Sequence, residues 1–164
     1  MTDEELIAEL RTMGIDAESH KVIALLPLVQ VAWADGTIQP AERKLIFQIA
    51  EENDMFIGDA GRILDSWLNN HPTEAYVVHG RKLLVELAQR ESGRLGETIS
   101  LSTLDEVLAF CESVALAAGG LFGILWTIDK RERIAIREIA HALDVDAESA
   151  IGWGAPDDEA HDDG

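Results

Sequence analysis

Two pairs of acidic residues have the chemistry to bind a cation. Asp35 and Glu42 lie on either side of a turn that contains a glycine, and Asp129 and Glu132 form a second pair later in the chain. Carboxylate oxygens are the ligands that hard cations such as calcium, magnesium and manganese prefer. If the fold brings the two pairs together, Asp35, Glu42, Asp129 and Glu132 form one oxygen-rich site for a divalent cation.

The stretch from Ala34 to Glu42 resembles the second half of a calcium-binding EF-hand loop. Such a loop has Asp, Gly, an aliphatic residue and Glu at its positions five, six, eight and twelve. Its positions one and three fall here on Val31 and Trp33, which have no side-chain oxygen. An ordinary EF-hand is therefore excluded, and Gly36 is interpreted as the residue that allows a turn with positive φ.

Helix capping offers a second explanation for the same acids. Pro40 suits the first position of a helix, and Glu42, at the third position, can accept a hydrogen bond from the backbone of Gln39. Asp129 and Glu132 repeat this spacing as a second capping box. Cation binding and capping both remain open at this point.

No constellation typical of an enzyme accompanies these acids. The five histidines are His20, His71, His79, His141 and His161. None of them has a Glu or another His at the sequence spacing that is typical of metal ligands. Cys111 lies in an apolar run and is interpreted as a buried thiol rather than a nucleophile. We therefore expect binding and not catalysis, with a hydrolytic or redox enzyme as a distant alternative.

Helices must position these residues, because apolar side chains recur at helical spacing and no stretch alternates apolar and polar residues between hairpin turns. The sequence predicts a compact all-α bundle of about seven to eight helices. The expected helices cover 2–14, 19–34 with a kink at Pro27, 40–53, 59–69, 73–89, a helix from Ser102 into the apolar stretch 113–128, then 129–143 and 146–153. A loop is expected over 91–100.

Each amphipathic helix has a predicted inward face and several have a predicted N-cap. Thr2, Asp59 and Thr73 are expected to cap helices, as are two overlapping capping boxes that begin at Ser102 and Thr103. The predicted core positions are Leu6, Ile7, Leu10, Leu45, Ile46, Ile49, Ala50, Ile63, Leu64, Trp67, Leu68, Val77, Leu83, Leu84, Leu87, Ile134, Ile136, Ile139 and Ala140. The uncharged stretch 113–128 is shorter than the roughly 20 residues that span a bilayer, so we assign it to the core and expect no membrane span.

Two segments of the chain resemble each other. Aligning Glu42 with Glu132 without a gap also pairs Arg43, Ile46, Ile49, Ala50 and Asp54 with Arg133, Ile136, Ile139, Ala140 and Asp144. This pattern predicts an internal repeat of a helix-turn-helix unit related by a pseudo-two-fold. The alternative is that two amphipathic helices share an apolar stripe by chance.

The charge of the chain restricts its partners. With 31 acidic and 13 basic residues the net charge is −18, which repels phosphate backbones, so nucleic-acid binding is disfavoured. Five acids lie in 157–163, and removing these five charges leaves −13 for the rest. We expect one helical domain over 1–154, an acidic disordered tail over 155–164, and a cytoplasmic location, since the first residues lack the pattern of a secretory signal.

A family resemblance rests on the sequence Val31-Ala32-Trp33-Ala34-Asp35-Gly36, followed by Ile38, Glu42 and the stripe Ile46, Ile49 and Ala50. These residues resemble the TerB family of tellurite-resistance proteins, over about residues 20–145. The resemblance implies an all-helical bundle, an acidic surface associated with metal binding, and a role in stress response through protein complexes, some at the membrane. The second family signature is present only as Ile128-Asp129 and Glu132, without the Ala-Asp-Gly sequence.

The leading functional expectation is therefore a non-enzymatic interaction module that responds to a divalent cation. Its expected partner is a protein with a basic surface or a membrane-protein complex, which would place the chain in the cytoplasm or at the inner membrane through that partner. The alternative is a metal-independent structural adaptor or a protein-binding domain similar to a co-chaperone.

Overall fold

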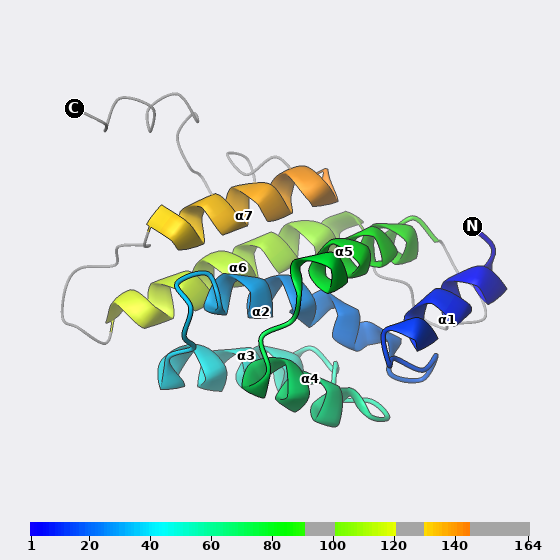
Figure 1. The fold of residues 1–164 in the computed structure, drawn as a ribbon, viewed down its shortest axis with the longest axis horizontal. Coiled ribbons are helices and arrows are strands. Elements are labelled where there is room, and N and C mark those ends of the chain that lie inside the picture. Colours follow the sequence, from blue (N-terminus) through cyan, green and yellow to red (C-terminus); the bar gives the residue numbers. More distant parts are fainter. Residues whose placement is uncertain (91–100, 121–129, 145–164) are drawn as a thin grey trace.

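The fold is an all-α bundle, seen in a computed structural model that describes residues 1–90, 101–120 and 130–144 but not the side chains of 101–103 and 118–120. In chain order the elements are α1 (Asp3–Thr12), the 3₁₀ helix η1 (His20–Leu25), α2 (Leu26–Ala32), α3 (Pro40–Glu52), α4 (Ala60–Asn69), α5 (Glu74–Ala88), α6 (Leu101–Gly120) and α7 (Lys130–Leu143) (Figure 1). The described ranges contain helices and no strand, which confirms the predicted fold class.

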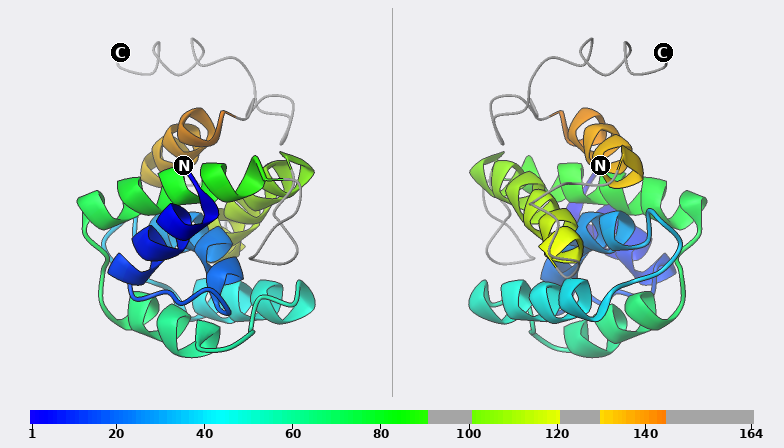
Figure 2. Two further views of the ribbon diagram at one scale, coloured as in Figure 1. Left: turned by 90° about the vertical axis from the view of Figure 1, so that its right-hand side faces the viewer. Right: turned by 90° about the vertical axis from the view of Figure 1, so that its left-hand side faces the viewer.

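Helix α2 lies at the centre of the bundle, with α3 and α4 on one side of it and α6 and α7 on the other (Figures 1 and 2). It packs against α3, α4, α5, α6 and α7. Every residue of α2 except Gln30 is buried. A helix that is surrounded in this way must be apolar around its circumference, because no face remains for water. The apolar segment of the predicted second helix is thus confirmed as the buried core.

The predicted single helix over 19–34 with a kink at Pro27 is instead two successive helices. The chain first makes the 3₁₀ helix η1, and α2 begins at Leu26 with Pro27 in its first turn. The missing N–H of a proline costs little there, since the first amide groups of an α-helix have no intrahelical acceptor. Pro27 therefore starts an α-helix instead of bending a continuous one.

Most of the predicted core positions are confirmed as buried, including the inward faces of α1, α4 and α5. Leu45 is partly buried and packs against this core. Ile134 was expected in the core, but 46% of its surface is exposed. Its neighbours Ala135 and Ile136 are buried instead, because α7 turns the Ala135, Ile136 and Ile139 face towards the bundle. The prediction for Ile134 is therefore wrong.

Side-chain caps fix several of the helix ends. Thr2 and Thr73 cap α1 and α5, as predicted: each accepts a hydrogen bond from a backbone N–H, Thr2 from Glu5 and Thr73 from Tyr76. Glu5 also bonds back to Thr2 and completes a capping box that was not predicted. Asp59 makes no side-chain cap, and its own N–H donates to the Ser19 hydroxyl at 2.8 Å. Helix α6 begins at Leu101, so the residues predicted to cap it, Ser102 and Thr103, lie inside its first turn.

Helix α1 is attached to α5 at three places along its length. At its start, Asp3 accepts a hydrogen bond at 2.8 Å from Nε of Arg90, which lies two residues beyond the end of α5. In the middle, Glu9 contacts His79 Nε2 at 2.9 Å. Just beyond its end, the carbonyl of Met13 accepts a hydrogen bond from the Tyr76 hydroxyl at 2.7 Å. The residue numbers fall on one helix as they rise on the other, so the two helices run antiparallel.

The two halves of the predicted repeat have matching environments. Glu42 and Glu132 are both buried, as are the paired positions of the apolar stripes of α3 and α7. Asp54 and Asp144, which the alignment also pairs, both have positive φ, at 53° and 56°. These matches are what a repeat predicts, although two unrelated helices can end in the same way, and the duplication stays a prediction.

Several predictions concern residues outside the described ranges. These are Asp129, the loop 91–100, the part of the apolar stretch 113–128 from residue 121 onward, the short helix 146–153, the tail 155–164 and the domain boundary between 154 and 155. Within the residues that are described, no helix is both long enough and apolar enough to cross a membrane.

Candidate functional site

Two glutamates meet inside the bundle. Glu42 comes from the first turn of α3 and is 0% exposed, and Glu132 comes from the first turn of α7 and is 2% exposed. They are the only buried carboxyl groups in the described ranges. Glutamate is almost never fully buried without a partner, because its charge loses its hydration there. The pair is therefore the position in the described structure that most needs a chemical explanation.

The contacts of Glu42 leave part of its carboxyl group without a donor. Oε2 accepts a hydrogen bond from the backbone N–H of Gln39 at 3.0 Å, as the capping interpretation predicted. Oε1 is buried and receives no hydrogen bond from the part of the chain that the structure describes. The carboxyl group of Glu132 lies within hydrogen-bonding reach of Glu42. Because ionised carboxylates only accept, this contact becomes a hydrogen bond only if one of the two carries a proton.

Burial and neighbouring charges shift the titration of Glu42. Loss of hydration is the largest cause, and with the charges of Glu132 and Asp35 it raises the pKa of Glu42 to about 8, although the Gln39 N–H acts in the opposite direction. Like-charged groups that share a buried site resist ionising together. At neutral pH the pair therefore holds a proton, unless a cation compensates for its charge.

Asp35 lies near the glutamates but has its own local role. It is half-buried, and its Oδ1 accepts a hydrogen bond from the backbone N–H of Thr37 at 3.2 Å. Gly36 between them has a φ of +95°, which confirms the predicted positive-φ turn. The Asp35 carboxylate thus closes the turn before α3 and acts on Glu42 through its charge.

The four predicted cation ligands are only partly brought together. Glu42 and Glu132 are in contact, Asp35 is close enough to influence Glu42, and Asp129 lies outside the described ranges. Among the residues that are described, no group of three or more His, Cys, Asp or Glu side chains is arranged to hold a metal ion. The chemistry that the pair offers is a buried, proton-binding oxygen cluster to which a hard cation could add with water or backbone oxygens.

The other candidate groups have structural partners. The pKa of the Cys111 thiol is strongly raised because the residue is fully buried, so the reactive thiolate is suppressed. His20 Nδ1 contacts the carbonyl of Ala17 at 2.8 Å, and His79 is held by Glu9. These three side chains therefore have roles in packing and in linking elements.

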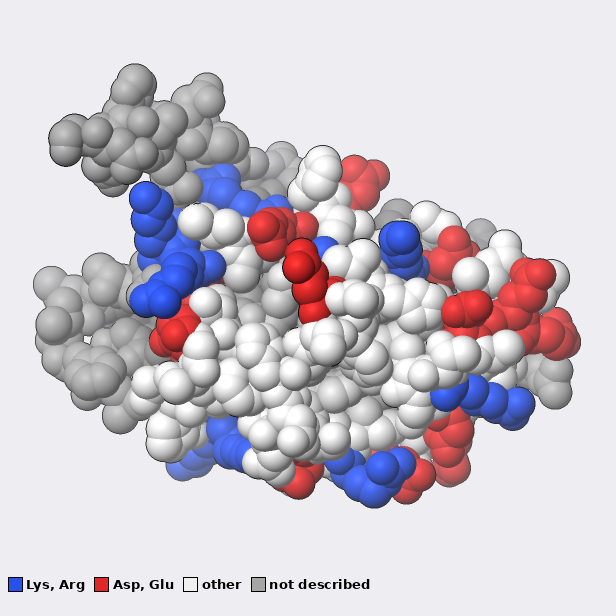
Figure 3. Space-filling view, in the orientation of Figure 1, with Lys and Arg blue, Asp and Glu red and all other residues white. Residues whose placement is uncertain are grey.

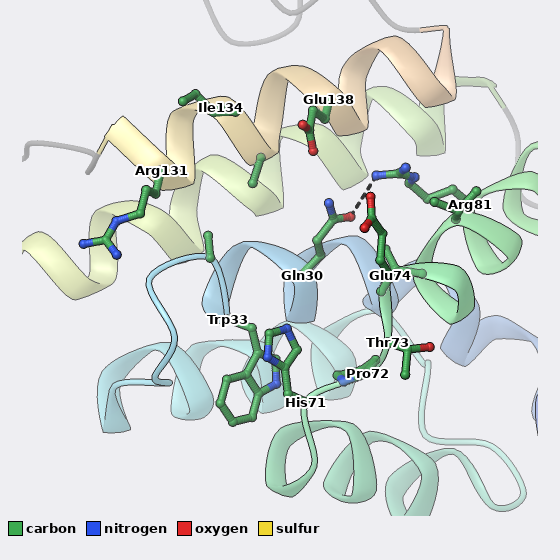
Figure 4. A pocket seen from close by; sticks show the side chains of 14 residues that line it. Gln30, Trp33, His71, Pro72, Thr73, Glu74, Arg81, Arg131, Ile134 and Glu138 are labelled. Carbon is green, nitrogen blue, oxygen red and sulfur yellow. Dashed lines mark hydrogen bonds between the residues drawn. The ribbon is translucent and has the colours of Figure 1, made fainter.

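A second site was not expected from the sequence. A groove of about 630 Å³ lies between the C-terminal end of α2, the start of α5 and one face of α7 (Figure 4). Trp33 stacks on His71 inside it, with ring centres 4.8 Å apart and planes 5° from parallel. Trp33 Nε1 also donates to the carbonyl of Trp67 at 2.9 Å. The only sequence signal was a tryptophan at the end of an otherwise apolar helix.

Comparisons with protein-family models, with curated proteins and with solved structures found no match to this chain.

Proposed function

We propose that this chain is a non-enzymatic, TerB-like protein-interaction module whose folded state responds to a divalent cation or a proton at the Glu42–Glu132 pair. The observation that carries the proposal is the burial of two touching carboxyl groups, one of which has an oxygen without a donor in the described ranges. A buried site of this kind is unfavourable unless a positive charge joins it. Calcium, magnesium and manganese fit an oxygen-only donor set.

The position of the pair supports a regulatory role. Glu42 and Glu132 each lie in the first turn of a helix, and both α3 and α7 pack against the central helix α2. A cation or proton that joins the pair lowers the repulsion between the two helices and favours their close packing. The occupancy of this site would then control how firmly α3 and α7 are held in the bundle.

The proposed partner is a protein with a basic surface, either alone or within a membrane-protein complex. A net charge of −18 increases the rate at which a positively charged partner associates and disfavours nucleic acid. Placing this complex in a stress response related to tellurite follows from the family resemblance alone. The competing proposal is a metal-independent adaptor, which the capping role of Glu42 also supports.

Thermal unfolding of chelator-treated protein, with each of the three cations added, separates these proposals. A cation that binds only the folded state raises its stability by about 2.7 kcal/mol at 100 times its Kd. Glu42→Gln keeps the shape of the side chain and removes its charge, so this gain should largely disappear. Glu51→Gln, an exposed position on the same helix, is the matched control and should keep it.

The outcomes are distinct. Stabilisation of the wild type and the control, but not of Glu42→Gln, supports the site. No stabilisation by any of the three cations favours the adaptor, and equal stabilisation of Glu42→Gln would mean that the cation binds elsewhere. Purification from the native host tests the partner, since a basic protein should co-purify at low salt and dissociate at high salt.

A further inference from the structure

The groove beside α7 has the size and lining of a binding site. Pockets for small ligands and side chains are typically about 300–1,000 Å³ and mostly apolar, and this groove lies within that range. Its apolar surface comes from Trp33, Val77, Ala135 and the exposed Ile134. A large aliphatic side chain that is 46% exposed beside a stacked tryptophan offers apolar surface for a ligand to cover.

Positive charge gathers at one end of this groove. Lys130, Arg131 and Arg133 occupy three of the first four positions of α7, in a chain that has only 13 basic residues. The space-filling view shows basic side chains grouped where α7 begins (Figure 3). Figure 4 shows Arg131 at that end of the groove, while Arg81, which donates to Gln30 at 3.2 Å, lies towards the other. Glu74 and Glu138 also line the groove, away from Arg131 (Figure 4), so a ligand that complements it carries its acids at the Arg131 end and an apolar anchor beside Ile134.

The segment that follows α7 has this chemistry in the matching order. Ile151 and Trp153 come first, and the acids of 157–163 follow. Ile134 lies nine residues before Leu143, which is about 14 Å along a helix. The seven residues 144–150 can extend over about 23 Å, and they still span about 14 Å if the predicted helix over 146–153 includes 146–150. A chain that returns antiparallel to α7 can thus bring its apolar residues to Ile134 and its acids to Lys130 and Arg131.

We propose that the groove formed by α2, α5 and α7 is the binding site for the chain's own segment 151–163. Ile151 and Trp153 contact Trp33 and Ile134, and the acids of 157–163 lie against the basic start of α7. This inference goes beyond the proposed function, because the groove and the Glu42–Glu132 pair are separate sites. An external acidic peptide would then have to displace this segment before it could bind.

Paramagnetic relaxation in the full-length chain tests the proposal. Ala160→Cys introduces a labelling site among the acids without changing their charge, and Cys111 is fully buried and does not compete for the label. With a nitroxide at position 160, the amide signals of His71, Thr73, Glu74 and 131–135 should lose most of their intensity, relative to the reduced label. A segment that does not bind would instead broaden signals around the C-terminal end of α7, and this result would overturn the proposal.

Matched variants give the specificity of the effect. In the labelled chain, Ile134→Asp and Arg131→Glu should each restore the lost signals, because they remove the apolar contact and reverse one charge. Ala142→Ser, an exposed position on the same helix that does not line the groove, should leave the broadening in place. Broadening that survives both of the first two variants would contradict the proposal. Preserved dispersion of the α3 signals shows that the variants remain folded.

A mixture of labelled unenriched chains and unlabelled isotope-enriched chains separates the two arrangements. Only the enriched, unlabelled chains give signals in the mixture. If these signals keep their intensity, the loss occurs only within the labelled molecule, and this supports binding within one chain. Equal loss in the mixture would show that a second copy occupies the groove, and would overturn the assignment.

Discussion

Replacing Glu42 by glutamine should change how the stability of the protein depends on pH. The pKa of this carboxyl group is raised from 4.5 to about 8 in the folded state, mainly by burial. Below pH 4.5 both the folded and the unfolded chain hold the proton, so the shift has no effect there. Between pH 4.5 and about 8 the unfolded chain releases the proton while the folded chain keeps it. Stability is therefore lost as the pH rises through this window.

The size of the effect follows from the same shift. Each pH unit inside the window costs about 1.4 kcal/mol, so the wild type should lose roughly 3 kcal/mol from this group between pH 5 and pH 7.5. Glu42→Gln has no such proton to hold, and its amide can donate to Glu132. The variant should have a stability similar to the wild type at pH 5 and should be more stable by roughly 3 kcal/mol at pH 7.5.

Urea denaturation followed by far-ultraviolet circular dichroism, with a chelator present, measures this difference at both pH values. Glu51→Gln is the control for removing a negative charge from α3 at an exposed position. Other titrating groups affect all three proteins alike, so the informative quantity is the change in the difference between variant and wild type. A difference that is the same at pH 5 and at pH 7.5 would refute the assignment of a held proton to the pair.

Three further substitutions test the packing, each by urea or thermal unfolding. Gly80→Ala places a methyl group against the buried side chain of Leu26, so it should destabilise the fold by about 1–3 kcal/mol even though alanine favours a helix; an increase in stability would contradict this close approach. Arg90→Met removes the ion pair with Asp3 and should cost about 1.5–3 kcal/mol, with incomplete rescue by lysine, because lysine lacks the planar guanidinium fork. Gly36→Ala has open space but a φ of +95°, so it should cost about 1–2 kcal/mol, and Gly36→Asn should cost less.

The helices were predictable because local signals and burial agree along most of this chain. The spacing of apolar residues located α1, α3, α4 and α5, and Thr2, Gln39 and Thr73 marked three of their starts. The junction at Pro27 was not predictable in detail, since whether a proline bends a helix or begins one depends on the backbone before it. The exposure of Ile134 was also missed. The apolar residues of α7 form a broad stripe, and their spacing in the sequence does not show which residue at the edge of that stripe the bundle covers.

The contact between Glu42 and Glu132 was anticipated from the alignment of two acidic helix starts, which is a long-range inference from a local pattern. The groove had no comparable signal. Trp33 and His71 belong to segments that are distant in sequence, and their stacking depends on how α4 and α5 are oriented against α2. Neither ring has a sequence context that indicates its partner, so this part of the candidate surface required the structure.

The three attachments between α1 and α5 have a consequence for local unfolding. Terminal helices usually fray on their own, and their amide hydrogens then exchange with solvent much faster than those of the core. Here Asp3, Glu9 and Met13 connect α1 and the residue that follows it to the antiparallel α5 and to Arg90 just beyond it. We expect the two helices to open as one cooperative unit, so that the protected amides of α1 exchange at the rate of α5 and proteases do not cut α1 before α5 opens.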